Sequence, residues 1–219
     1  MATRHILETD SIWLNFGERM VLKSIYLKIE TGEIVGLLGR NGCGKSCLLR
    51  SIFGTQTTEN KSVRIDKQYI EKPYQGSGIL RYLSQKNFVP SSMRVKTALE
   101  YYEVNLPDAY SNYTSQNLRF GELSGGERRF LETLMIVFSP VKFILLDEPF
   151  SNISPLRVEE LVAILHQQKQ NKGIIITDHL YREVLNHSNR LYLLSDGALI
   201  ALKNPKQDLI DRGYLPDDN

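Results

Sequence analysis

The residues best suited to chemistry lie in the first quarter of the chain, in a stretch with the pattern Gly-x-x-x-x-Gly-Lys-Ser. They are Gly39, Arg40, Asn41, Gly42, Cys43, Gly44, Lys45 and Ser46. Glycines at this spacing let the backbone wrap a polyphosphate, so that amide groups and the start of a helix face negative charge. Lys45 can then reach the terminal phosphates, and the Ser46 hydroxyl can ligate Mg²⁺. The pattern predicts a loop that binds a nucleoside triphosphate.

The flanking sequence supplies the elements that must hold such a loop. Residues 33–38 are mostly apolar and predict a buried strand, and residues 46–53 predict the opening of a helix. The alternative is a glycine-rich turn without a function. It is disfavoured because a strand before the loop and a helix after it are the context that phosphate binding requires.

A second set of chemical groups follows the apolar residues 143–146. Asp147 and Glu148 stand at the carboxyl end of this predicted strand, which is the edge where ligands bind in open α/β sheets. Asp147 is placed to hold the Mg²⁺ shell, and Glu148 to face the water that attacks the terminal phosphate. Alone, two acids at a strand end could be solvated surface groups. Beside a phosphate loop, the functional interpretation is favoured.

Hydrophobic periodicity gives a coarse outline of the remaining elements. Strands are predicted at residues 5–16, 21–29, 63–70, 78–83 and 173–177, helices at 95–105, 125–137, 155–170 and 180–187, a looser helical signal at 117–120, and a closing hairpin at 190–195 and 198–203. Strands that alternate with helices in the second half imply a parallel sheet with helices on its faces. We therefore predict an α/β fold with a helical insertion, and no disordered tail before residues 216–219.

Composition limits the class of protein. The chain has 219 residues, of which 42% are hydrophobic and 24% charged, as in soluble globular proteins. A net charge of +2 without a run of Lys or Arg does not suggest a nucleic-acid partner. No apolar stretch reaches the ~18 residues of a membrane span, and the N-terminus does not resemble a secretory signal. We expect a cytoplasmic protein without direct membrane insertion, in which Cys43 and Cys47 are neither a disulfide nor a metal pair.

A third motif identifies a family. Leu123, Ser124, Gly125, Gly126 and Glu127 form the stretch Leu-Ser-Gly-Gly-Glu, between the phosphate loop and the acidic strand. Alone, it could be an ordinary serine N-cap. In this order of motifs, the chain resembles the ATP-binding cassette (ABC) ATPases that drive ABC transporters. The stretch is a second glycine-rich helix start, and the resemblance implies that two domains stack head to tail, each offering Ser124 to the ATP of the other.

The resemblance assigns roles to further residues. Gln85 matches the glutamine that reaches Mg²⁺ and the attacking water, and His179 matches the histidine that contacts the γ-phosphate. Phe16 matches the aromatic residue that stacks on adenine, and Cys47 offers its backbone amide to the α-phosphate. The residues expected to act in catalysis are therefore Glu148, His179 and Gln85.

For the whole chain, the resemblance implies one ABC ATPase domain, residues 1–219. A P-loop NTPase core with a parallel sheet would carry an N-terminal antiparallel β subdomain and a short helical insertion at about residues 86–138. The implied protein hydrolyses ATP as a homodimer or as a heterodimer with a paralogue. It docks on separate membrane-spanning permease subunits at the inner face of the membrane.

The sequence departs from the family at three positions. Ser154 stands where the family has an aspartate, Cys47 where it has a hydroxyl residue, and Phe130 where it has a second basic residue. The departures at Ser154 and Cys47 keep a non-hydrolysing partner cassette open as an alternative. ABC ATPases outside transport are a further alternative. The two cassettes of translation-associated members and the long heptad segment of chromosome-maintenance members are both absent from this sequence.

Overall fold

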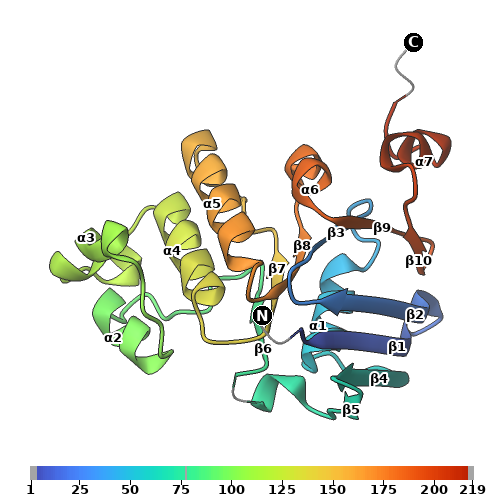
Figure 1. The fold of residues 1–219 in the computed structure, drawn as a ribbon, viewed down its shortest axis with the longest axis horizontal. Coiled ribbons are helices and arrows are strands. Elements are labelled where there is room, and N and C mark those ends of the chain that lie inside the picture. Colours follow the sequence, from blue (N-terminus) through green and yellow to red (C-terminus); the bar gives the residue numbers. More distant parts are fainter. Residues whose placement is uncertain (1–3, 77, 217–219) are drawn as a thin grey trace.

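Two sheets with helices between and beside them make up the described part of the chain, residues 4–76 and 78–216 of a computed structural model (Figure 1). The strands are β1 (Ile6–Phe16), β2 (Arg19–Glu30), β3 (Ile34–Leu38), β4 (Asn60–Ile65), β5 (Gln68–Tyr69), β6 (Leu80–Leu83), β7 (Phe143–Asp147), β8 (Gly173–Thr177), β9 (Arg190–Ser195) and β10 (Ala198–Ala201). The α-helices are α1 (Lys45–Phe53), α2 (Val95–Tyr101), α3 (Ser111–Ser115), α4 (Gly125–Val137), α5 (Pro155–Gln168), α6 (Tyr181–His187) and α7 (Pro205–Asp211). Short 3₁₀ turns are η1 (Pro73–Gln75), η2 (Asp108–Tyr110) and η3 (Phe120–Glu122).

The larger sheet confirms the predicted α/β fold. Among the described residues, its order is β10-β9-β3-β8-β7-β6. All neighbours pair in parallel except β9 and β10, which form the predicted closing hairpin. Every residue of β3, β7 and β8 is buried, because helices cover both faces of the sheet and the strands can be apolar throughout.

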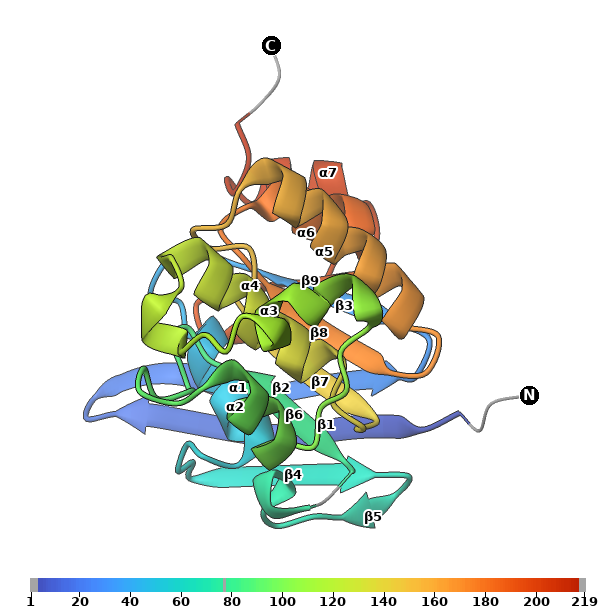
Figure 2. The same ribbon diagram turned by 90° about the vertical axis from the view of Figure 1, so that its left-hand side faces the viewer.

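The smaller sheet confirms the antiparallel arrangement of the N-terminal strands. Its order in the described chain is β2-β1-β4-β5, and each neighbouring pair is antiparallel. Alternate residues of β1 and β2 point into a core that they share with α1 and with one face of β3, β7 and β8. Helix α1 therefore lies between the two sheets, as Figures 1 and 2 show from two directions.

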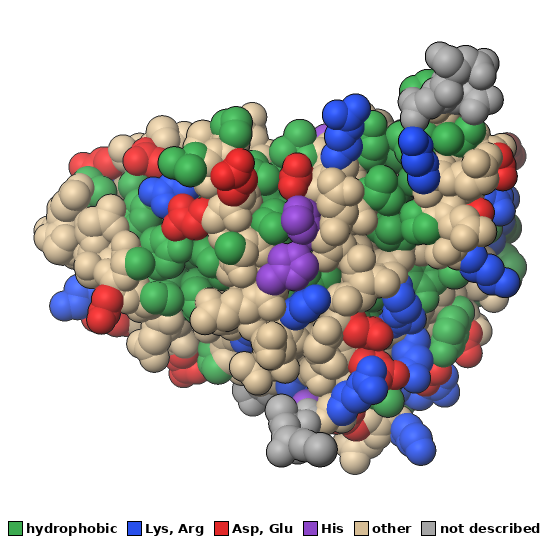
Figure 3. All heavy atoms as spheres, turned by 45° about the horizontal axis from the view of Figure 1, so that its top comes forward, with side chains coloured by type: hydrophobic (Ala, Val, Ile, Leu, Met, Phe, Trp, Pro, Cys, Tyr) green, Lys and Arg blue, Asp and Glu red, His purple; other side chains and the backbone are tan. Residues whose placement is uncertain are grey.

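The other face of the parallel sheet is covered by helices from the second half of the chain. Buried residues of α4, α5 and α6 share one core with β6, β7 and β8. Helices α2, α3 and α4 belong to the segment predicted as a helical insertion. They lie together at one end of the molecule in Figure 1. On the face drawn in Figure 3, basic and acidic side chains are interspersed with apolar ones.

Several predicted boundaries are wrong, and left-handed backbone explains most of them. The strand predicted at 63–70 is two strands, because the chain turns at Asp66 and Lys67, whose φ values are 51° and 69°. The helix predicted at 95–105 ends at Tyr101, just before Glu103, with φ 55°. The helical signal at 117–120 is not an α-helix, because Asn117 has φ 54° and Arg119 pairs with a residue of another segment.

Helices α3 and α7 were not predicted. Each is a single short stretch of five or seven residues, and so little sequence carries no clear helical period. Helix α7 matters for the site below, because the turn after it lies against the phosphate loop. Of the tail predicted at 216–219, residues 217–219 lie outside the described residues.

The close approach of β7 and β8 gives a test of the packing. Gly173 is the parallel partner of Phe143, and a Cβ at Gly173 would lie 2.6 Å from the Phe143 ring. We expect Gly173→Ala to lower the free energy of unfolding by about 1–3 kcal/mol, as overpacked cores do. In a Phe143→Leu background, which removes the ring, the same change should cost clearly less. Urea denaturation of the four variants measures this coupling, and equal costs in both backgrounds would contradict it.

Candidate nucleotide-binding site

The phosphate loop joins β3 to α1, as predicted. Helix α1 begins at Lys45, and Gly44 before it has a left-handed backbone with φ 111°. A Cβ at Gly44 would also lie 2.7 Å from the Val21 side chain, so both backbone and space require glycine here. The loop's amides and the start of α1 can therefore face one point above the sheet.

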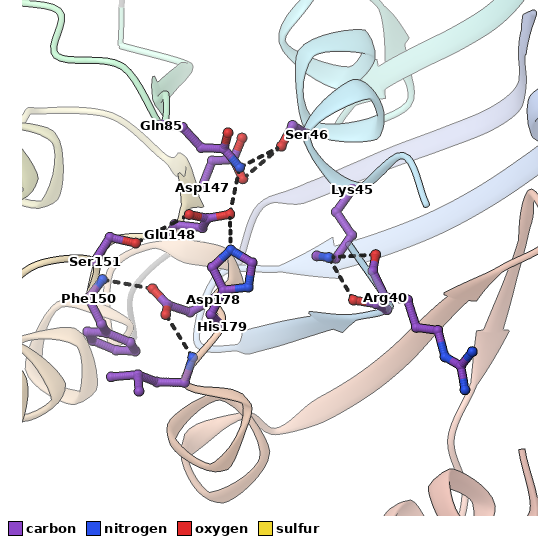
Figure 4. A network of polar contacts seen from close by, with 12 residues as sticks. Arg40, Lys45, Ser46, Gln85, Asp147, Glu148, Phe150, Ser151, Asp178 and His179 are labelled. Atoms are coloured by element: carbon purple, nitrogen blue, oxygen red, sulfur yellow. Dashed lines mark hydrogen bonds and ion pairs between the residues drawn. The ribbon is translucent and has the colours of Figure 1, made fainter. Parts of the chain in front are cut away.

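The Lys45 side chain is held inside the loop. Its Nζ donates to the carbonyl oxygens of Gly39, at 2.7 Å, and Arg40, at 3.3 Å (Figure 4). These are neutral acceptors, and within the described chain no carboxylate forms an ion pair with this ammonium group. The positive charge is therefore available to an anion that enters the loop.

A cavity of about 400 Å³ lies beside the loop. It is lined by Phe16, Arg19, Val21, Asn41, Gly42, Gly44, Lys45, Ser46, Cys47, Gln85, Glu148 and His179. Most of the sequence-predicted site residues thus meet at one cavity. Arg19 was not predicted. Its Nη2 donates to Gly42 O at 3.1 Å, and in the sequence it is one of two adjacent charged residues without a motif, Glu18 and Arg19.

Three residues of the loop do not line this cavity. Gly39, Arg40 and Cys43 are absent from its lining. Arg40 and Cys43 line a second cavity, and Arg40 Nη2 donates to Gly213 O at 2.9 Å. Burial raises the pKa of the Cys43 thiol, which favours its neutral form. Only the backbone of these residues can therefore serve the nucleotide side in this conformation.

Oxygen ligands meet at the start of α1. Ser46 Oγ donates to Asp147 Oδ1 at 3.1 Å, and Tyr82 OH donates to Asp147 Oδ2 at 2.9 Å. Gln85 Nε2 lies 3.2 Å from Ser46 Oγ. Burial raises the pKa of Asp147, and the hydrogen bonds from Ser46 and Tyr82 oppose this. A hydroxyl and a carboxylate are donor types that Mg²⁺ accepts together with phosphate oxygens, so Ser46 and Asp147 fit this ion. Gln85, which contacts Ser46 through its amide nitrogen, would have to present its amide oxygen instead.

Glu148 joins the ends of three strands. Its Oε1 accepts a hydrogen bond from Gln85 Nε2 at 2.6 Å and lies 2.9 Å from His179 Nε2. Its Oε2 lies 3.3 Å from Ser151 Oγ (Figure 4). The backbone of Glu148 has φ 56°, a conformation that costs energy in a residue with a side chain and is concentrated at functional sites. The three residues predicted to act in catalysis are therefore in direct contact.

Two buried charged residues that were not predicted support this arrangement. Asp178 accepts from the amides of Phe150, at 2.8 Å, and Leu180, at 2.9 Å, so it fixes the segments after both Glu148 and His179. Arg129 donates to the carbonyl oxygens of Ser84, Asp147 and Glu148. In the sequence, the position of Asp178 beside His179 could have indicated its role. Nothing in the sequence indicates which arginine of α4 is buried.

The segment Ser124 to Gly126 lies elsewhere. Ser124 caps α4, since its Oγ accepts from Glu127 N at 3.2 Å while Glu127 Oε2 accepts from Ser124 N at 3.0 Å. A Cβ at Gly126 would lie 2.5 Å from Asn152 O, so this glycine lets α4 pack on the loop before Ser154. Within the described chain, none of residues 124–126 lines the cavity beside the phosphate loop.

Comparison with known proteins agrees with these motifs. A family model described as "ABC transporter" matches residues 22–151, more than half of the chain. The chain belongs to the ABC transporter family. The lipopolysaccharide export system ATP-binding protein LptB of Escherichia coli (strain K12) is 33% identical over 223 residues, covering 91% of this chain and 92% of LptB. LptB of Haemophilus influenzae is 29% identical, covering 94% and 93%.

Solved structures show the same fold. An ATP-binding subunit of an ABC transporter superposes with a TM-score of 0.81 at 18% identity, covering 97% of this chain and 95% of its own. A nucleotide-free ATP-binding cassette gives 0.79 at 22% identity, covering 97% and 98%. The family and the LptB relatives show that the chain is an ATP-binding, ATP-hydrolysing subunit of an ABC transporter. In the part of the chain that the structure describes, every helix is too short or too polar to cross a bilayer.

Replacement of Lys45 tests the phosphate loop. We expect Lys45→Ala to weaken ATP binding by roughly 10- to 100-fold, since charge-assisted hydrogen bonds contribute about 1.5–3 kcal/mol each, and to abolish hydrolysis. Arg40, the other cation of the loop, is bonded to Gly213 O and cannot substitute without moving. Titration calorimetry with ATP measures the affinity, and Lys96→Ala on α2 is the matched control. Unchanged affinity in Lys45→Ala would remove the phosphate-loop assignment.

Proposed function

We propose that this ABC ATPase hydrolyses ATP at the cavity beside its phosphate loop, with Glu148 polarising the attacking water. The observation that supports this most is the contact of Glu148 with both Gln85 and His179, at the end of the strand that also supplies Asp147. A carboxylate that accepts from a fixed amide is held in one orientation. Positioning and electrostatics of this kind carry most of the catalysis in phosphoryl transfer.

The remaining cavity residues would bind the nucleotide. Phe16 is about half exposed at the cavity rim, where its ring can stack on adenine. The amides of the loop, of Ser46 and of Cys47 would bind the phosphates, with Lys45 at the terminal ones. Ser46, Asp147 and Gln85 would hold Mg²⁺, which when bound neutralises charge on the β- and γ-phosphates. His179 would contact the γ-phosphate and keep Glu148 oriented.

The site is completed, on this proposal, by a second cassette. Residues 124–126 form an anion-binding helix start that lies apart from the chain's own loop, so they would serve ATP bound by a partner. The loop that Gly126 contacts leads to Ser154, which is exposed, and to Leu156 at the start of α5, which is 75% exposed. Such exposure is expected for a surface that a second copy or a paralogue covers. ATP binding would close this dimer, and hydrolysis would open it.

The transport partner would dock next to the segment that contains Gln85. A groove of about 490 Å³ lies between Phe53 and Tyr82 on the core side and Phe88, Tyr101 and Tyr102 on the helical side. Tyr101 is 73% exposed, and the ring of Tyr102 packs on both Tyr101 and Phe88. We assign this groove to a short apolar helix of a membrane-spanning subunit. Residues 86–138 then form the helical subdomain of a single ABC ATPase domain that works at the inner face of the membrane.

The catalytic assignment is tested by Glu148→Gln. The change keeps the shape of the side chain and removes its charge, so we expect turnover to fall by about 10²- to 10⁴-fold while ATP affinity is retained. Phosphate release measures the rate. With ATP and Mg²⁺, size-exclusion chromatography should show about twice the monomer mass, because a dimer that cannot hydrolyse ATP stays closed.

Glu159→Gln, an exposed acid on α5, is the matched control and should hydrolyse ATP at the wild-type rate. If Glu148→Gln also does so, Glu148 is not the base.

Ser154 tests the dimer interface. Its side chain is exposed at the start of α5, and in the described structure it makes no capping hydrogen bond. We expect Ser154→Asp to raise the steady-state ATPase rate without changing the affinity of the monomer, because a carboxylate there can pair with donors across the interface. Rates and monomer affinities of both versions decide this. Altered monomer affinity with an unchanged rate in the assembled transporter would place Ser154 away from the interface.

A further inference from the structure

Tyr82 lies between the ATP site and the groove assigned to the membrane-spanning partner. It belongs to β6, the terminal strand of the larger sheet in the described chain. Its side chain packs on the core that α1 shares with the two sheets. Part of it also lines the groove of about 490 Å³, while its hydroxyl reaches Asp147 at the end of β7. One side chain therefore contacts both functional regions of the molecule.

Two hydroxyls bind the Asp147 carboxylate. Tyr82 OH donates to Oδ2 at 2.9 Å, and Ser46 Oγ donates to Oδ1 at 3.1 Å. Asp147 is 1% exposed, so a carboxylate oxygen that lost its donor would lack water as a substitute. Within the described chain, the Tyr82 hydroxyl has no second hydrogen-bond partner. Its polar end is therefore committed to the carboxylate that we assign to Mg²⁺.

The ring of Tyr82 packs against Phe53. The two ring centroids are 5.5 Å apart, and the planes are tilted by 45°. Phe53 is the last residue of α1, the helix that begins at Lys45, and it also lines the groove. Because close-packed interiors transmit displacements and a phenol ring is rigid, the ring cannot shift without moving its hydroxyl. A change of packing in the groove can therefore reach Asp147 through Tyr82.

We propose that Tyr82 is a positioning residue that holds Asp147 for Mg²⁺ and connects this carboxylate to the groove of the membrane-spanning partner. An apolar helix that fills the groove would restrict the Tyr82 ring and so keep Asp147 oriented. Coupling between two binding events is reciprocal, so the groove would take the helix more tightly when nucleotide and Mg²⁺ are bound. This inference deepens the proposed function and rests on its assignments of the ion and of the groove.

Tyr82→Phe tests the hold on Asp147, because it keeps the ring and removes only the hydroxyl. The probe is an ATP analogue with a non-hydrolysable imido bridge between the β- and γ-phosphates, titrated by calorimetry with Mg²⁺ and again with EDTA. We expect the affinity to fall about two- to tenfold with Mg²⁺, the effect of one hydrogen bond, and to be unchanged with EDTA.

Tyr74→Phe is the matched control. Tyr74 also packs on Phe53, with ring centroids 6.1 Å apart, but its hydroxyl is bonded to the Gln75 side chain and not to Asp147. This variant should match the wild-type protein in both titrations.

Phe53→Leu tests the link to the groove, because it removes the ring behind Tyr82 and leaves Asp147 and both hydroxyl donors in place. We expect the affinity with Mg²⁺ to fall about twofold, a typical effect of coupling between residues in contact, and the affinity with EDTA to be unchanged. In a Tyr82→Phe background the same change should have no further effect with Mg²⁺, since the hydroxyl that carries the coupling is already gone. Additive losses in the double variant would refute the link.

The outcomes separate this inference from the proposed function. If Tyr82→Phe binds the analogue as tightly as the wild-type protein with Mg²⁺, the positioning role is refuted and the function stands. Equal losses with Mg²⁺ and with EDTA would show a purely structural contact and would also refute it. Equal affinities of the wild-type protein in both conditions would refute the assignment of the ion to Asp147 and this inference with it. Failure of the wild-type protein to bind the analogue in either condition would refute the proposed function itself.

Discussion

Parallel pairing of β6, β7 and β8 is the constraint on which the rest of the structure depends. In this register Leu83 pairs with Leu146 and Leu146 with Ile176, and Asp147 pairs with Thr177 one residue further. Parallel strands that end in register put the residues beyond them at one edge of the sheet. Gln85 and Glu148 come two positions after Leu83 and Leu146, and His179 comes three positions after Ile176. The pairing of the strand backbones therefore brings these three residues to the same place.

The apolar strands that form this edge also remove its charged side chains from water, which costs free energy. Burial raises the pKa values of Asp147 and Asp178 and lowers that of Arg129, because each loses hydration. Each is compensated by directed hydrogen bonds: hydroxyls bind Asp147, backbone amides bind Asp178, and Arg129 binds carbonyl oxygens. Groups held in this way do not reorganise when charge develops, which is the property that electrostatic catalysis needs. The fixed surroundings also explain how Glu148 is kept in a left-handed backbone conformation.

The sequence predicts the parts of this site that depend on local pattern. Glycine spacing gives the phosphate loop, an apolar run followed by two acids gives β7, and a Ser-Gly-Gly start gives α4 with the boundaries found. It does not give the supports, since the burial of Arg129 and the contact of Tyr82 with Asp147 depend on which elements pack together. Element ends were also missed where Asp66, Glu103 and Asn117 take left-handed backbone. Asp and Asn favour turns and left-handed backbone, but only some of these residues adopt it, so residue type alone does not mark the position where an element ends.

At Phe130 the sequence departs from the basic residue that the family has, and the core accommodates the aromatic ring. Phe130 is 1% exposed in the core, where the Arg157 guanidinium of α5 lies 4.5 Å from its ring centroid. The face of α4 that turns to the strand ends carries Arg129 instead, with hydrogen bonds to Ser84, Asp147 and Glu148. The positive charge of Arg129 therefore contacts both the residue before Gln85 and the end of β7. Ser124 caps the start of α4. If a partner's nucleotide binds there, as proposed above, a movement of this helix start would be transmitted along α4 to Arg129 and to the carbonyl groups that Arg129 binds.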